Sequence, residues 1–82
     1  MPKMRRLSGK DVVKILQRLG FEIFSQEGSH IRLQRIVDGQ QQRVLVAVHG
    51  SKTLKPGTTK DIYNQAKRFV PEDELRPLFY TD

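Results

Sequence analysis

Two strand-like segments joined by a short turn constrain the fold of this chain more than any other feature. Polar and apolar residues alternate over His30–Ile36, and β-branched residues are dense over Arg43–Val48. Between them lies Asp38-Gly39, a pair typical of a two-residue hairpin turn. Because alternation marks a strand with one buried face, we expect an antiparallel hairpin that packs one side against a core.

A helix and a short strand are expected before this hairpin. Ser8 and Asp11 have the spacing of a capping box, and apolar residues recur at helical spacing until the stop signal Gly20. This pattern predicts a helix over residues 9–19. Apolar residues within 21–24 then predict a short strand that ends before a glycine turn.

A second helix is expected after the hairpin. Thr58 or Thr59 is its predicted cap, and Thr58 and Asp61 are again spaced as a capping box. Pro71 can occupy the first position of a short third helix. The predicted fold class is therefore α+β in the order αβββα. It has a three-stranded antiparallel sheet covered on one face by two helices, plus a short C-terminal helix.

The chain is small and basic. Its 82 residues fit a single domain, with a core over about residues 7–70 and an extension over 71–82. It carries 15 Lys and Arg against 9 Asp and Glu, a formal net charge of +6, and the excess lies in residues 1–70. Clustered positive charge favours binding to nucleic acid, although many small domains carry several net charges for solubility alone.

Several classes of protein are disfavoured by the composition. The chain has no cysteine, which excludes a disulfide framework and a cysteine-based zinc site. The longest unbroken apolar run, Val44–Val48, is far shorter than the about 20 residues that a membrane-spanning helix needs. The basic N-terminus leads into no apolar segment, so no secretory signal is expected. We therefore expect a cytoplasmic protein that does not bind a membrane and needs no cofactor or metal.

The alternation assigns both histidines to one face of the sheet. If Ile31 and Leu33 face the core, His30 and Arg32 face away from it. On the other strand of the hairpin, the expected core-facing residues are Val44, Val46 and Val48. His49 then emerges on the same open face as His30.

Two hairpin registers keep these faces matched. A two-residue turn at Asp38-Gly39 pairs Val37 with Gln40 and places His30 opposite Ala47. A loop longer by two residues places His30 opposite His49 instead. A shift of one residue would turn the apolar side chains outward, so it is excluded. The sequence leaves the choice between the two allowed registers open.

Four motifs follow one another along the chain: Gly28-Ser29-His30, Val48-His49-Gly50, Leu54-Lys55-Pro56-Gly57-Thr58 and Gln65-Ala66. Together they resemble the HicA family, also called YcfA-type toxins, of type II toxin–antitoxin systems. The resemblance runs from about Leu7 to Lys67. It implies a fold like the double-stranded-RNA-binding domain and an endoribonuclease that cleaves mRNA, neutralised by a cognate HicB-type antitoxin. It also implies that His30 is the catalytic histidine.

The residues around His30 suit metal-independent cleavage of RNA. Imidazole can take and give a proton near neutral pH, so His30 is the candidate general base or acid, and His49 is a possible second one. DNA lacks the 2′-hydroxyl that this chemistry uses, so no DNA substrate is expected. The candidate RNA-binding residues are Gly28, Ser29, Arg32, Lys52, Lys55 and Lys60.

Two other functions fit the same residues. The first is a non-catalytic RNA-binding module, because phosphate affinity comes mostly from Lys and Arg and does not need a histidine. The second is a protein-interaction module whose basic face meets an acidic partner. Replacement of His30 separates the first of these from an enzyme, because only an enzyme would lose cleavage while it keeps its affinity for RNA. The stretch from Val70 onward extends beyond the resemblance and leaves the contacts with an antitoxin open.

Overall fold

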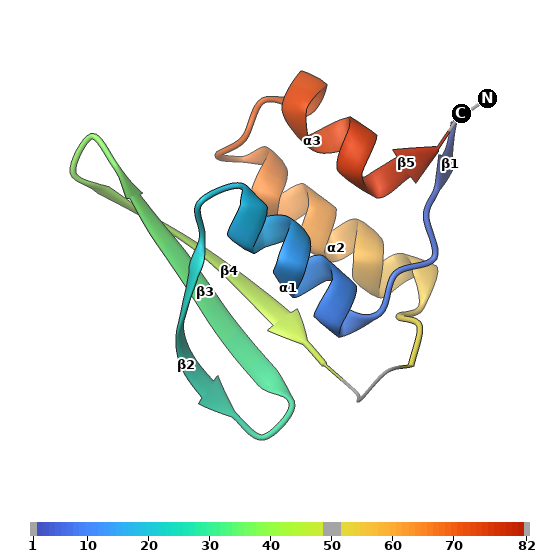
Figure 1. The fold of residues 1–82 in the computed structure, drawn as a ribbon, viewed down its shortest axis with the longest axis horizontal. Coiled ribbons are helices and arrows are strands. Elements are labelled where there is room, and N and C mark those ends of the chain that lie inside the picture. The colour runs from blue at the N-terminus through green and yellow to red at the C-terminus, as the bar shows by residue number, and fades with distance from the viewer. Residues whose placement is uncertain (1, 49–51, 82) are drawn as a thin grey trace.

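A three-stranded antiparallel sheet and three helices form most of the computed structural model, which describes residues 2–48 and 52–81 (Figure 1). The elements are β1 (Lys3–Met4), α1 (Gly9–Arg18), β2 (Glu22–Glu27), β3 (His30–Val37), β4 (Gln40–Ala47), α2 (Pro56–Lys67), α3 (Glu72–Phe79) and β5 (Tyr80–Thr81). The sheet order is β2-β3-β4. The predicted αβββα order with a short C-terminal helix is therefore confirmed. Among the described residues, no helix is long and apolar enough to cross a membrane.

Helix α1 begins at the predicted capping box. The Ser8 hydroxyl accepts a hydrogen bond from the Asp11 backbone N–H at 3.1 Å, and the Asp11 carboxylate accepts one from the Ser8 N–H at 3.0 Å. These bonds satisfy two of the backbone donors that a helix start leaves free. At the other end, Gly20 has a φ of +96°, a left-handed conformation that favours glycine and ends the helix. Val12 and Leu16 from α1 are fully buried in the core.

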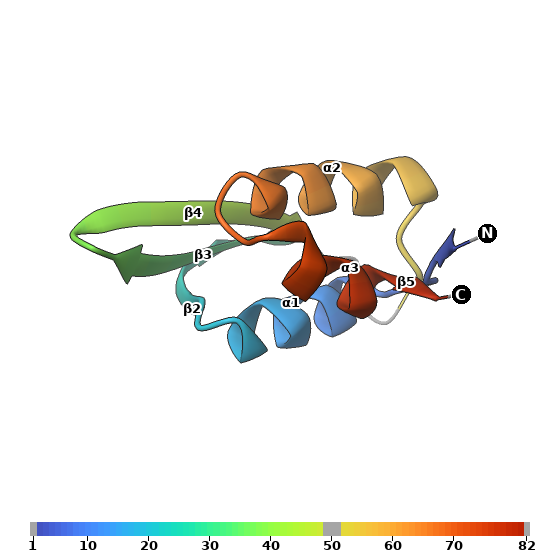
Figure 2. The same cartoon turned by 90° about the horizontal axis from the view of Figure 1, so that it is seen from above.

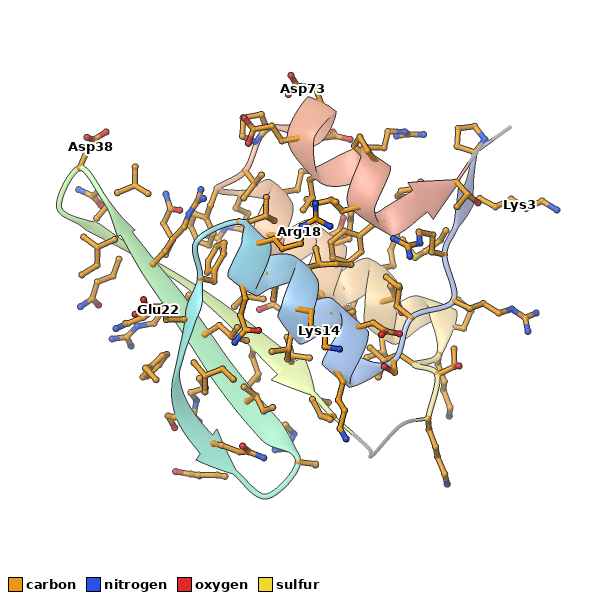
Figure 3. The ribbon with its side chains drawn as sticks, viewed as in Figure 1. Lys3, Lys14, Arg18, Glu22, Asp38 and Asp73 are labelled. Carbon is orange, nitrogen blue, oxygen red and sulfur yellow. The ribbon has the colours of Figure 1, made fainter. Side chains whose placement is uncertain are left out.

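The β3–β4 hairpin has the shorter of the two allowed registers. Val37 pairs with Gln40 and His30 pairs with Ala47. The alternative, which placed His30 opposite His49, is wrong. The physical reason is the turn, where Asp38 and Gly39 have φ values of +52° and +78°. Positive φ at both positions defines a type I′ turn, whose twist matches that of the paired strands. Figure 3 shows Asp38 at the tip of the hairpin, beyond the helices.

Helix α2 begins earlier than the sequence predicts. Its cap is Lys55, and Pro56 occupies the first helical position, so the predicted cap at Thr58 or Thr59 is wrong. Proline suits this position because its φ is fixed near the helical value and the missing N–H would have no helical partner. Thr59 lies inside the helix instead, where it is buried and its hydroxyl donates to the Lys55 carbonyl. Similarly, Pro71 is the residue before α3 rather than its first position.

The C-terminal segment is part of the core. Leu75 and Phe79 on α3 are fully buried and belong to the same cluster as the sheet and the first two helices. Burial of side chains of this size contributes about 1.5–3 kcal/mol each. The Tyr63 hydroxyl on α2 donates to Glu72 at 3.0 Å, which joins the second and third helices. Burial, together with this bond, raises the pKa of Tyr63.

Two short terminal strands, β1 and β5, were not expected from the sequence. β1 and β5 pair side by side with Lys3 opposite Thr81, and Figures 1 and 2 show them together at one end of the molecule. The Arg5 N–H also donates to the Phe79 carbonyl at 2.8 Å. The chain before α1 and the chain after α3 therefore hold each other in place.

The guanidinium group of Arg35 joins the part of the β3–β4 hairpin near its turn to both main helices. It donates to the carbonyl of Leu19 after α1 at 2.8 Å and to that of Phe69 after α2 at 3.2 Å. It also donates to Gln42 across the hairpin, and its carbon Cζ lies 4.9 Å from the centre of the Phe21 ring. Carbonyls at a helix C-terminus lack backbone partners and carry partial negative charge, so a cation there is favourable.

The capping box predicts how stability depends on pH at the acid end. The backbone hydrogen bond from Ser8, helped by the Ser8 hydroxyl, holds the pKa of Asp11 below its usual value of 3.8. The Asp11 carboxylate therefore binds a proton less readily in the folded chain than in the unfolded chain. The stabilisation is fully present above pH 3.8 and is lost as the pH falls through the lowered pKa. We expect Asp11→Asn to melt below the wild type at neutral pH and the gap to close in acid.

Asp61→Asn is the control for this comparison, because Asp61 lies within α2 and takes part in no cap. Its melting temperature is expected to follow the wild type throughout. A gap for Asp11→Asn that stays constant between pH 7 and pH 2 would contradict the assignment.

Candidate functional site

His30 is the first residue of β3 and lies directly after a tight turn. Gly28 in this turn has a φ of +56°, and the Ser29 carbonyl accepts a hydrogen bond from Val48 N–H at 2.6 Å. The next residue, Ile31, is buried, whereas His30 is exposed on the opposite face of the sheet. The prediction that this imidazole faces away from the core is confirmed. The turn places it at the end of the sheet, open to a ligand.

A cavity of about 430 Å³ lies next to the residue opposite His30. Ala47, the register partner of His30, lines this cavity. The rest of the lining is Lys52, Thr53, Leu54, Lys55 and Thr58. Two of the predicted RNA-binding lysines therefore lie at the same end of the sheet as His30. We call this cavity the lysine pocket.

The start of α2 adds positive potential to the lysine pocket. Lys55 is the cap of this helix, and no described side chain caps its first turn. The first N–H groups of a helix lack partners within it, and the helix dipole makes this end favourable for anions. With the two ammonium groups, the pocket is suited to a phosphate.

Contacts on both sides fix the position of the lysine pocket. The Leu54 N–H donates to the Leu7 carbonyl at 2.8 Å, and the Leu54 side chain is buried. On α2, the Gln65 side chain accepts from the Leu45 N–H at 3.0 Å and donates to the Leu45 carbonyl at 3.2 Å. This amide therefore pairs with the outer edge of β4 as a neighbouring strand would. The pairing holds α2, and with it Lys55 at the start of the helix, in place beside β4.

The other predicted site residues lie in different surroundings. Arg32 is exposed on the same face of the sheet as His30. Lys60 lies near the C-terminal segment, where its ammonium group donates to the Tyr80 hydroxyl at 3.2 Å. His49 lies outside the described residues. The structure therefore brings Arg32, Lys52 and Lys55 towards His30 and turns Lys60 to another partner.

One charged residue near His30, Glu27, was not predicted from the sequence. Glu27 is the register partner of His30 across the turn, and its carboxylate lies 3.8 Å from the Arg32 guanidinium. Both side chains are substantially exposed, so this ion pair contributes little to stability. The two-residue separation of Glu27 and His30 by Gly28-Ser29 could have predicted this pairing, because the residues on either side of a two-residue hairpin turn face each other. Among the described residues, no group of three or more His, Asp or Glu side chains could hold a metal ion.

Replacing Gln65 tests whether its amide protects the edge of β4. In Gln65→Ala the Leu45 N–H loses its partner and exchanges with solvent, so we expect its hydrogen-exchange protection to fall at least tenfold. Because water can replace the lost bonds at this exposed edge, the loss of stability should be only about 1 kcal/mol. Amide exchange followed by NMR measures both effects. Asn64→Ala, an exposed neighbour on α2, is the control, and equal protection of Leu45 in all three chains would contradict the assignment.

Comparison with known proteins identifies the family. A family model described as the HicA toxin of bacterial toxin–antitoxin systems matches residues 9–67. The match includes His30 and both lysines of the lysine pocket, and it ends before α3. No curated protein sequence matches the chain.

Proposed function

The chain belongs to the HicA toxin family of bacterial toxin–antitoxin systems, and we propose that it is an endoribonuclease that cleaves mRNA with His30 as its catalytic histidine. The observation that carries the proposal is the exposed imidazole at the end of the sheet, next to a pocket lined by two lysines. An imidazole has an unperturbed pKa near 6.5, so it suits proton transfer at neutral pH.

The proposed reaction uses the 2′-hydroxyl of the RNA as nucleophile. His30 removes the proton from this hydroxyl, and the oxygen forms a bond to the adjacent phosphorus. The bond from phosphorus to the 5′-oxygen breaks, and that oxygen leaves with a proton from an acid. His49 is the candidate for this acid. General acid–base catalysis of this kind typically contributes about 10²–10⁴-fold to the rate.

Charge that builds up on the phosphate needs fixed positive partners. Lys52 and Lys55 line the pocket next to Ala47, and they are the proposed cations for the scissile phosphate or its neighbour. Arg32 lies two residues after His30 on β3, on the same face of the sheet, and can hold an adjacent phosphate. The Ser29 hydroxyl and the backbone N–H groups near Gly28 are proposed donors to a non-bridging oxygen. Because Lys60 bonds to Tyr80, we leave it out of this site.

The proposed regulator is a HicB-type antitoxin that covers the same basic surface. An inhibitor that presents carboxylates to Lys52, Lys55 and Arg32 would complement their charge and exclude RNA. The proposed place of action is the cytoplasm, where mRNA is available.

Replacement of His30 tests the catalytic assignment. Purified wild type and His30→Ala are incubated with a single-stranded RNA in EDTA, and cleavage is followed on a denaturing gel. We expect His30→Ala to cut at least 100-fold more slowly. Its affinity for RNA should change less than threefold, since cations supply most of that affinity. Binding without cleavage by either chain would identify a non-catalytic RNA-binding module. Equal cleavage by both would exclude His30 as the catalytic residue.

The salt dependence of RNA binding tests the lysine pocket. Each phosphate contact to a single strand contributes about 0.7 to the slope of log affinity against log salt. On the His30→Ala background, replacing Lys52 and Lys55 with alanine should lower this slope by about 1.4. The matched control replaces Lys10 and Lys14 on α1, which removes the same charge from the helical side; Figure 3 labels Lys14 there. Equal losses in the two double variants would indicate that only net charge matters.

A further inference from the structure

An exposed aromatic ring lies on the open face of the sheet beside an arginine. Phe24 on β2 is 41% exposed, although phenylalanine is a residue usually found in cores. The guanidinium carbon of Arg43 lies 5.1 Å from the centre of the Phe24 ring. Arg43 is itself held by a hydrogen bond of 3.0 Å to Gln41. The ring and the cation are therefore arranged together before any ligand binds.

Phe24 lies on this face at a β-bulge. Ile23 pairs with Leu33, and Ser25 pairs with Arg32, so Phe24 is an extra residue between two paired positions. Because Ile23 is opposite the core-facing Leu33, alternation turns Phe24 to the open face, and the extra residue lets Ser25 stand opposite Arg32 on that face as well. Arg43 precedes the buried Val44 and so faces away from the core, and the contact with Arg43 puts the Phe24 ring on that same face.

The ring lines a shallow hollow of about 250 Å³. The full lining is Phe24, Arg32, Arg43, Val44, Leu45 and Gln65. Leu45 is 42% exposed and adds apolar surface next to the ring. None of the described residues that line the hollow is acidic; the nearby Glu27 contacts Arg32 from outside it. We call this hollow the aromatic pocket.

We propose that the aromatic pocket binds one unpaired base of a single-stranded RNA, stacked on Phe24, with Arg32 and Arg43 on the neighbouring phosphates. The proposal rests on the part of the proposed function in which this face of the sheet binds RNA. Charge complementarity supports this ligand, because a nucleotide offers a flat apolar base flanked by negative charge and the pocket offers a ring flanked by two cations. A base within a duplex is stacked between its neighbours, so only an unpaired base can contact the ring.

The position of the aromatic pocket fits a role next to the cleavage site. Arg32 pairs with Leu45, and His30 pairs with Ala47, one step of two residues further along both strands. Such a step is about 7 Å. The near edge of the aromatic pocket, at Arg32 and Leu45, is therefore one such step from His30, and the Phe24 ring, beside Arg43, lies about one step beyond it. A base on Phe24 then belongs to a nucleotide near the scissile bond. The pocket would then position the strand and select RNA that is locally unpaired.

The test measures RNA binding on the His30→Ala background, so that the RNA stays intact. The probe is a short single-stranded RNA that carries 2-aminopurine, whose fluorescence falls when it stacks. Removing one stacking partner should weaken binding about 5- to 150-fold. We expect this loss in Phe24→Ala and a smaller one in Phe24→Leu, while Phe24→Trp retains affinity and quenching. Ile23→Ala is the matched control, because Ile23 is a similarly exposed neighbour that pairs with the core-facing Leu33. It should bind as the parent does.

The outcomes separate this proposal from the proposed nuclease. If Phe24→Ala binds single-stranded RNA as tightly as the parent, or if Ile23→Ala loses as much, the base site is wrong. Equal dependence on Phe24 for a duplex of the same sequence would also overturn it. If the Phe24 variants bind the antitoxin more weakly but bind RNA as the parent does, the pocket is a protein contact and the proposal fails. Phe24-dependent binding by a wild type that cuts no RNA would overturn the nuclease and leave the base site standing.

Discussion

The register between β3 and β4 is the constraint on which both pockets depend. It is set by a turn in which two successive residues, Asp38 and Gly39, have positive φ. A shift of one residue would bury His30 and expose Ile31 and Leu33, because side chains alternate between the faces of a strand. The burial of these two apolar residues therefore fixes the exposure of the imidazole. The same pairing places Ala47, and so the lysine pocket, beside it.

Hydrogen bonds from side chains to backbone groups link the helices to this hairpin. Gln65 bonds to both backbone groups of Leu45 and holds α2 against the edge of β4. Arg35 bonds to the carbonyls that follow α1 and α2. Both side chains are polar and both satisfy backbone groups that would otherwise need water. The surface of the proposed site is thus built on elements whose relative positions are set by the shared apolar core together with these specific bonds.

Local patterns in the sequence were enough for the element order, the cap at Ser8 and the outward direction of His30. These features depend on residue spacing within one segment. The β-bulge at Phe24, the pairing of β1 with β5 and the destination of Lys60 were not predicted. Each depends on contacts between distant segments, which a single sequence does not reveal. The start of α2 was misplaced because two threonines offered a plausible cap and the stronger preference of Pro56 for the first helical turn was overlooked.

The burial of Leu75 and Phe79 has a consequence for how the protein is made. These side chains come from α3, which follows every other helix in the chain, yet they complete the core that α1 and the sheet begin. A nascent chain on the ribosome therefore lacks part of this core until α3 has left the exit tunnel.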